Sequence, residues 1–166
     1  GLYRYSAAGE LEPDLAAGLP ELSEDEKQYT VHLRPGLHWH DGTPVTSADV
    51  VFTIAAVKDP ERGSPLMAAW QQTSAEAPDP LTVKFTTKDI SGPFVHNLTL
   101  PIIQQATWEQ VDAKDFAISP KNLTPVGTGP YRVSSITSLP TGGVSSEVLQ
   151  SAGEYFRRPA RTESVP

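Results

Sequence analysis

The spacing of apolar residues changes from a period of two to a period of about 3.6 within one short segment, and this change constrains the fold most. Over residues 29–34, apolar and polar residues alternate, and after Pro35-Gly36 the alternation resumes at Leu37 and Trp39. Such alternation is typical of half-buried strands. Further along, three apolar residues share one face at helical spacing, namely Val50, Ile54 and Val57. The sequence therefore predicts strands, a turn and a helix, in that order.

Both ends of the predicted helix carry residues that favour helix boundaries. Asp41-Gly42 is a turn pair, and Thr46 is a favourable N-cap with Asp49 at the spacing of a capping box. Asp59-Pro60 then ends the helix. We expect the Thr46 hydroxyl to accept a hydrogen bond from an amide near Asp49, so that Thr46→Ala costs more stability than Asp49→Ala.

Shorter elements follow, separated by many turns, because the chain has 16 prolines and 12 glycines. The patterns predict a short helix over residues 66–72, a strand over 81–86, one or two helical turns over 94–100, a weak helix over 108–116, and strands over 131–133 and 144–150 joined by a turn at 140–143. The polar residues 159–166 are predicted to be loose. The expected fold class is mixed α/β (α+β), with short, mostly antiparallel strands and a few helices.

Composition excludes several classes of protein. The chain has 166 residues, 38% of them hydrophobic and 20% charged, which suits one globular domain with a core. A net charge of −7 and a pI near 5.0 argue against a nucleic-acid partner, because nucleic acid requires a basic face. The absence of cysteine excludes disulfides, thiolate metal sites and cysteine nucleophiles. No apolar run approaches the ~18 residues of a membrane span.

Three histidines, His32, His38 and His40, lie on the polar phase of the predicted strands. A chelating pair on a strand occupies positions i and i+2, so His38 and His40, with His32 as a third ligand, could form the zinc site of a metal-dependent enzyme. The alternative is that all three face solvent, which the alternation alone explains. Because the sequence has no HExxH motif and its spacing indicates no fourth ligand, it favours the solvated face.

Other motifs for catalysis or cofactor binding are missing from the sequence. There is no GxSxG nucleophile elbow, and the loop Gly127-Thr128-Gly129 lacks the Lys-Ser/Thr of a phosphate loop, while Pro130 removes an amide donor. Trp39 is predicted to lie in the core, whereas Trp70 and Trp108 could pack in the core or line a ligand groove. We expect no catalytic residue, no metal and no cofactor.

Several blocks of sequence together resemble one family. They are "GELEPDLAAGL", "YTVHLRPGLHWHDGTPVTSADVVFTI", "DPERGSP", "APDPLTVKFTTKD", "LTPVGTGPYRV" and "SAGEYFRRPA". In this order they are similar to the extracellular solute-binding proteins of family 5, the peptide- and nickel-type binding components of ABC importers. Two blocks depart from the family pattern, since "AAGLPEL" replaces its Glu-Ser-Trp and "SAGEYF" lacks its Asn-Pro.

The resemblance implies that the chain corresponds to the N-terminal portion of a longer, periplasmic-binding-protein-like fold with two lobes. Residues 1–28 would form the entry to the first lobe, residues 29–124 an extra subdomain carrying the signature strand, turn and helix, and residues 125–166 a return segment with a loose tail. In the family, the position of His40 is commonly histidine, whereas that of His38 is not. The resemblance thus implies a structural role for His40.

The function implied by the resemblance is non-catalytic capture of a peptide-like or other small solute for an ABC permease in the membrane. The implied location is extracytoplasmic, either periplasmic or anchored at the cell surface. An alternative is a stand-alone protein-interaction domain that kept this fold without transport.

The resemblance also implies two sets of site residues. The first would shape the structural motif and comprises His40, Asp41, Gly42, Thr46, Asp49, Gly127, Gly129 and Tyr131. The second would approach a bound ligand and comprises Met67, Trp70, Ile102, Gln104 and Gln105.

Overall fold

The computed structural model describes residues 1–138, 144–153, 155–157, 162 and 164–165. Its strands are β1 (Tyr3–Tyr5), β2 (Leu11–Pro13), β3 (Glu21–Leu22), β4 (Gln28–His32), β5 (Thr73–Asp79), β6 (Thr82–Thr87), β7 (Tyr131–Ser138), β8 (Val144–Ser151) and β9 (Ser164–Val165). The α-helices are α1 (Ser47–Lys58), α2 (Met67–Trp70), α3 (Phe94–Asn97) and α4 (Gln105–Trp108), and the 3-10 turns are η1 (Pro60–Arg62), η2 (Ala113–Asp115) and η3 (Pro120–Asn122). The predicted mixed α/β class with mostly antiparallel strands is confirmed.

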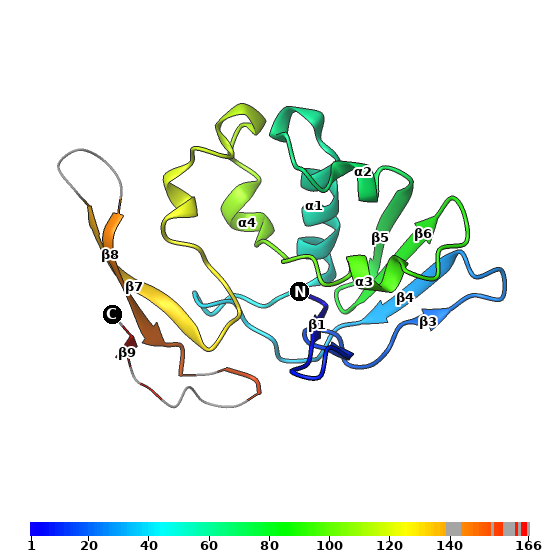
Figure 1. Ribbon diagram of the computed structural model, residues 1–166, viewed down its shortest axis with the longest axis horizontal. Coiled ribbons are helices and arrows are strands. Elements are labelled where there is room, and N and C mark those ends of the chain that lie inside the picture. Colours follow the sequence, from blue (N-terminus) through cyan, green and yellow to red (C-terminus); the bar gives the residue numbers. More distant parts are fainter. Residues whose placement is uncertain (139–143, 154, 158–161, 163, 166) are drawn as a thin grey trace.

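A four-stranded antiparallel sheet, in the order β3-β4-β6-β5, forms one end of the molecule (Figure 1). In β4 and β6 the predicted alternation is confirmed, since Tyr29 pairs with Phe85 and Val31 with Val83, and all four side chains are buried. The polar phase of β4 faces outward and includes the exposed His32. Helix α1 packs against β5 and β6.

The core beneath this sheet is rich in aromatic rings. Trp70 in α2 is only 2% exposed, and its ring lies 6.1 Å from that of Phe85 and 5.6 Å from that of Phe94. Tyr29 also contacts Phe94, at 4.8 Å between ring centroids. Trp39 is buried in the same hydrophobic cluster, as predicted. Of the two positions left open by the sequence, Trp70 therefore lies in the core.

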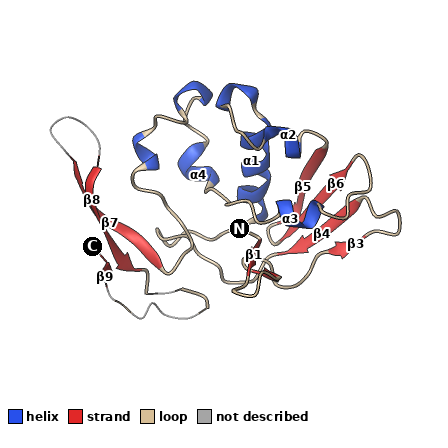
Figure 2. Ribbon diagram, viewed as in Figure 1, coloured by secondary structure: helices blue, strands red, loops and turns tan. Residues whose placement is uncertain are grey.

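A second sheet, β7-β8-β9, lies at the opposite end of the molecule, with the N-terminal β1-β2 pair between the two sheets (Figures 1 and 2). Strand β7 extends to residue 138, beyond the predicted residues 131–133, because β8 pairs with it along most of its length through two register shifts. Residues 164–165, predicted to be loose, pair with β8 as β9. The turn predicted at 140–143 lies outside the described residues.

Two elements differ from the sequence prediction. Strand β5 lies between the helix predicted over residues 66–72 and the strand predicted over 81–86, where no strand was expected. Its residues are mostly exposed, and it is held at the edge of the sheet by pairing with β6. The weak helix predicted over 108–116 is replaced by α4, which ends at Trp108, and by η2.

In the described part of the chain, no helix has the length and apolar character needed to cross a bilayer.

Candidate functional site

The segment over residues 37–45, here called the signature hairpin, links the four-stranded sheet to α1. Its two arms are joined by hydrogen bonds from the Trp39 amide to the Thr43 carbonyl (2.8 Å) and from the Val45 amide to the Leu37 carbonyl (2.9 Å). At its tip Gly42 has a φ of 84°, in the left-handed region that glycine adopts without the steric cost of a Cβ. The Asp-Gly turn expected from the sequence therefore closes this hairpin.

His40 ties the signature hairpin to the loop that precedes β7. The Gly127 amide donates to His40 Nδ1 at 3.2 Å, and His40 Nε2 lies 2.9 Å from the Gly129 carbonyl oxygen. Because Nδ1 accepts and Nε2 donates, this geometry places the ring proton on Nε2. A Cβ at position 127 would lie 3.2 Å from His40 Cε1, so glycine lets the loop approach the ring closely. Two members of the predicted structural set, 87 residues apart, are thus brought together.

The three histidines have separate surroundings. His32 lies near the Thr82 hydroxyl at 3.2 Å and near Glu21 at 3.5 Å, while His38 is exposed on the signature hairpin. Among the described residues, no group of three or more histidine, aspartate or glutamate side chains could hold a metal ion. The zinc-site alternative therefore has no geometric support in the described part of the chain.

Asp41 and Gln104 connect the signature hairpin to the start of α4. Thr43 donates to Asp41 Oδ1 through its amide (2.9 Å) and its hydroxyl (2.6 Å). Gln104 Nε2 donates to Asp41 Oδ2 and lies within hydrogen-bond distance of the Thr43 hydroxyl, each at 2.7 Å. Gln104 Oε1 accepts from the Thr107 hydroxyl. Neither Thr43 nor Thr107 was predicted to belong to this network. The Asp-Gly-Thr sequence was an available signal for Thr43, because an aspartate side chain in a turn commonly accepts a hydrogen bond from the residue two positions ahead.

This network changes the acidity of Asp41. Desolvation alone would raise the pKa of Asp41, but the hydrogen bonds from Thr43 and Gln104 together outweigh it and lower that pKa below its usual value. A carboxyl with a lowered folded-state pKa stabilises the fold above its unfolded pKa of about 3.9, and this stabilisation is lost as the pH falls through the folded-state pKa.

Asp41→Asn is therefore expected to destabilise the protein at pH 7 and to make less difference at pH 3, which lies below the unfolded pKa of the carboxyl, so that part of the parent's stabilisation is already lost there. Urea unfolding of the parent and the variant at both pH values measures this. An equal difference in unfolding free energy at the two pH values would contradict the assigned hydrogen bonds.

Asp49 is the centre of a second network, at the start of α1. The predicted capping box is present, and its Asp49 half is the stronger, because the Thr46 amide donates to Asp49 Oδ2 at 2.9 Å. The Thr46 hydroxyl also donates to the same oxygen at 3.4 Å, and the Asp49 amide donates to the Thr46 carbonyl at 3.1 Å. The geometry therefore favours the opposite order from the one expected from sequence, with Asp49 contributing more to stability than Thr46, and urea unfolding of the two alanine variants would decide between them.

Two further hydrogen-bond donors explain why Asp49 is expected to contribute more to stability than Thr46. Trp39 Nε1 donates to Asp49 Oδ2 at 3.3 Å, and the Gln105 amide donates to Asp49 Oδ1 at 2.8 Å. The Asp49 side chain is only 5% exposed. One buried carboxylate thus joins the signature hairpin, the start of α1 and the start of α4.

The five residues expected near a ligand do not all line the same pocket. Gln104 and Gln105 border a pocket of about 220 Å³ together with Trp39, Thr46, Asp49 and Glu109. Gln104 is buried within its own network, whereas Gln105 is partly exposed and donates to Glu109 Oε2 at 3.2 Å. Met67 and Ile102 are partly buried, and Trp70 lies in the aromatic core.

A second pocket, of about 230 Å³, lies on the other side of the signature hairpin. It is bordered by the hairpin, by the loop before β7 and by the segment that follows β8, and its lining residues include His38, Trp39, Arg132, Tyr155 and Phe156. Tyr131, a member of the predicted structural set, begins β7 beside this loop. Three segments far apart in sequence therefore meet at this pocket.

Comparison with known proteins identifies relatives of this arrangement. A family model described as bacterial extracellular solute-binding proteins, family 5 Middle, matches residues 10–139. Protein XP55 of Streptomyces lividans is 37% identical over 136 residues, which cover 79% of this chain and 24% of that protein. The glutathione-binding protein GsiB of Pectobacterium atrosepticum is 34% identical over 122 residues, which cover 68% of this chain and 21% of that protein.

Two solved structures also resemble this chain. The substrate-binding protein CtaP of Listeria monocytogenes has a TM-score of 0.83 and 30% identity over 96% of this chain and 32% of its own. NikZ of Campylobacter jejuni, in complex with Ni(L-His), has a TM-score of 0.85 and 27% identity over 99% of this chain and 32% of its own.

The chain spans about a quarter of the length of these curated relatives and about a third of these solved chains. The two solved structures match 96–99% of this chain at 27–30% identity. The chain belongs to the bacterial extracellular solute-binding proteins of family 5.

Proposed function

We propose that this chain is the N-terminal portion of an extracytoplasmic protein that captures a peptide-like or other small solute and delivers it to an ABC permease in the membrane. The observation that carries the proposal is the family match over residues 10–139. Related chains bind different solutes, since one is named for glutathione and another holds Ni(L-His). The proposal therefore names a class of small solutes rather than one compound.

The proposed role is capture without catalysis. The family and the fold are those of non-catalytic solute-binding proteins. Polar side chains around the signature hairpin are engaged within the protein, as His40 is with the Gly127 amide and the Gly129 carbonyl, and Asp49 with the Trp39 indole and the Gln105 amide. Such mutual bonding rigidifies a scaffold that can present a ligand surface.

We further propose that the surface beside the start of α4 approaches the ligand. Gln105 is the best-placed of the five proposed residues, because its side chain is partly exposed and borders a pocket. Ile102 and Met67, both partly buried, would contribute apolar contact area. Gln104 and Trp70 would act indirectly, through hydrogen bonds to the signature hairpin and through the aromatic core respectively.

The complete reading frame that contains this sequence provides the test. The proposal predicts that it continues for several hundred further residues, in line with the share of each relative that this chain covers. The protein expressed from it should carry a co-purified small solute detectable by native mass spectrometry. A stop codon directly after Pro166, with no solute bound, would contradict the proposal and favour the stand-alone interaction domain.

A further inference from the structure

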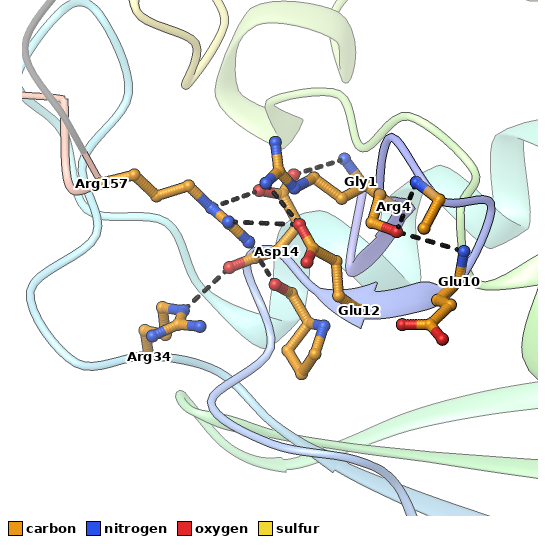
Figure 3. A network of polar contacts seen from close by, with 10 residues as sticks. Gly1, Arg4, Glu10, Glu12, Asp14, Arg34 and Arg157 are labelled. Atoms are coloured by element: carbon orange, nitrogen blue, oxygen red, sulfur yellow. Dashed lines mark hydrogen bonds and ion pairs between the residues drawn. The ribbon is translucent and has the colours of Figure 1, made fainter.

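The short segment Tyr155, Phe156 and Arg157, here called the strap, lies against the N-terminal part of the chain (Figure 3). Phe156 packs against the main hydrophobic cluster. Two arginine guanidinium groups lie near its ring, with Arg34 Cζ at 5.9 Å and Arg157 Cζ at 5.8 Å from the ring centroid. Both distances fall within the range of cation–π attraction.

Arg157 makes the charged contacts of the strap. Its Nε lies 3.2 Å from Asp14 Oδ1 and its Nη1 lies 3.6 Å from Glu12 Oε1, and its Nη2 donates to the Pro13 carbonyl. These contacts, here called the ionic clasp, join the strap to β2 and the residue after it, 144 positions earlier in sequence. The clasp thus connects two distant parts of the chain.

The acidic side of the clasp is held in place by other contacts. Arg4 pairs with Glu12 across the β1-β2 ladder, and Arg34 Nε donates to the Asp14 carbonyl at 2.9 Å (Figure 3). Because Arg4 holds the Glu12 carboxylate and Arg34 holds the Asp14 backbone independently of the strap, the acidic side of the clasp is positioned without Arg157.

Partial burial strengthens the clasp. The Arg157 side chain is 24% exposed and that of Asp14 is 19% exposed. The attraction between partly buried charges is screened less by water than that between fully exposed charges, and dissolved salt still weakens it. Removing Arg157 would leave Asp14 and Glu12 partly desolvated beside each other, which disfavours the docked strap.

The strap also forms one wall of the 230 Å³ pocket beside the signature hairpin, since Tyr155 and Phe156 line it together with Trp39 and His38. Upstream, the Ala152 amide is tethered to the Pro130 carbonyl at 2.9 Å, so the strap has a fixed point near the loop before β7. We propose that the strap is a conformational device that closes this pocket, and that breaking the ionic clasp opens it while the rest of the fold stays intact.

Limited digestion with chymotrypsin tests the proposal, because Tyr155 and Phe156 are its target residues and cleavage follows the population of the open strap. We expect Arg157→Gln to raise the rate of cleavage after these residues about tenfold, as suits the loss of one partly buried charged contact. Lys114→Gln, which makes the same charge change at an exposed residue of η2, should leave the rate unchanged. The thermal midpoint, read by circular dichroism, should move little in either variant.

Two further measurements test the same contact, and the first of them does not depend on whether Arg157→Gln folds. In the parent protein, the rate of cleavage should rise as salt is added toward about 1 M, because the Debye length there is about 3 Å and the ionic clasp is screened. The rate is divided by that of an unstructured peptide with the same cleavage sites, which corrects for the effect of salt on the protease. Asp14→Asn should raise cleavage less in the Arg157→Gln background than in the parent, because the pair is already broken. Cleavage insensitive to salt, additive effects of the two changes, or a rate for Arg157→Gln equal to that of Lys114→Gln would each overturn the proposal.

Discussion

Replacing Asp49 with alanine is expected to lower the free energy of unfolding by about 3–5 kcal/mol, a large share of the stability of a domain of this size. The carboxylate is 5% exposed and accepts hydrogen bonds from the Trp39 indole, the Thr46 amide and the Gln105 amide. Alanine leaves these donors without their acceptor, and water has little access to replace it. The loss should affect the signature hairpin, α1 and α4 together.

Urea unfolding followed by circular dichroism measures this loss. Thr46→Ala is the matched comparison at the same helix start, and it should cost only about 0.5–1 kcal/mol, because the Thr46 hydroxyl makes a long bond of 3.4 Å to the Asp49 carboxylate. Asp49→Asn should fall between the two, since it keeps one acceptor oxygen. A cost for Asp49→Ala no greater than that for Thr46→Ala would contradict the role assigned to the carboxylate.

Trp70→Ala is expected to destabilise the fold by about 3–5 kcal/mol, as is typical of a fully buried tryptophan. Its ring packs against Phe85 of β6 and Phe94 of α3, so truncation would leave a cavity between a helix and the sheet. The measurement is again the unfolding free energy in urea.

Trp70→Phe is the control for this experiment, because it keeps an aromatic ring against the same neighbours and should cost about 1–2 kcal/mol. If Trp70→Ala unfolded at the same urea concentration as the parent, Trp70 would not be a core residue. Any effect of Trp70 on solute binding must therefore be measured where the variant is still folded.

Local patterns were enough to predict β4, β6 and α1. Each of these elements is specified by neighbours in sequence: alternation buries Tyr29, Val31 and Phe85, and the capping box with Asp59-Pro60 sets the two ends of α1. The family resemblance added the structural role of His40, which the bond from the Gly127 amide explains.

The remaining features depend on contacts that no local pattern encodes. Asp49 accepts a hydrogen bond from the Gln105 amide, 56 residues away, and Gln104 donates to Asp41, 63 residues away. Strand β5 is half polar and forms only because β6 offers it an edge. Trp70 lies in a segment without clear periodicity, so its burial followed only from the arrangement of the sheet and α3.

We infer that this chain supplies one part of a solute-binding site rather than a complete one. Solute-binding clefts gain affinity by burying most of the ligand, whereas a peptide on a single face keeps much of its surface hydrated and still loses conformational freedom. Isothermal titration calorimetry with di- to pentapeptides, on the isolated 166-residue chain and on the protein from the complete reading frame, tests this most directly. We expect no binding by the isolated chain at micromolar concentration and clear binding of a solute by the longer protein. Micromolar binding by the isolated chain, lost on replacing Gln104 and Gln105 with alanine, would instead show that the site is complete within this chain.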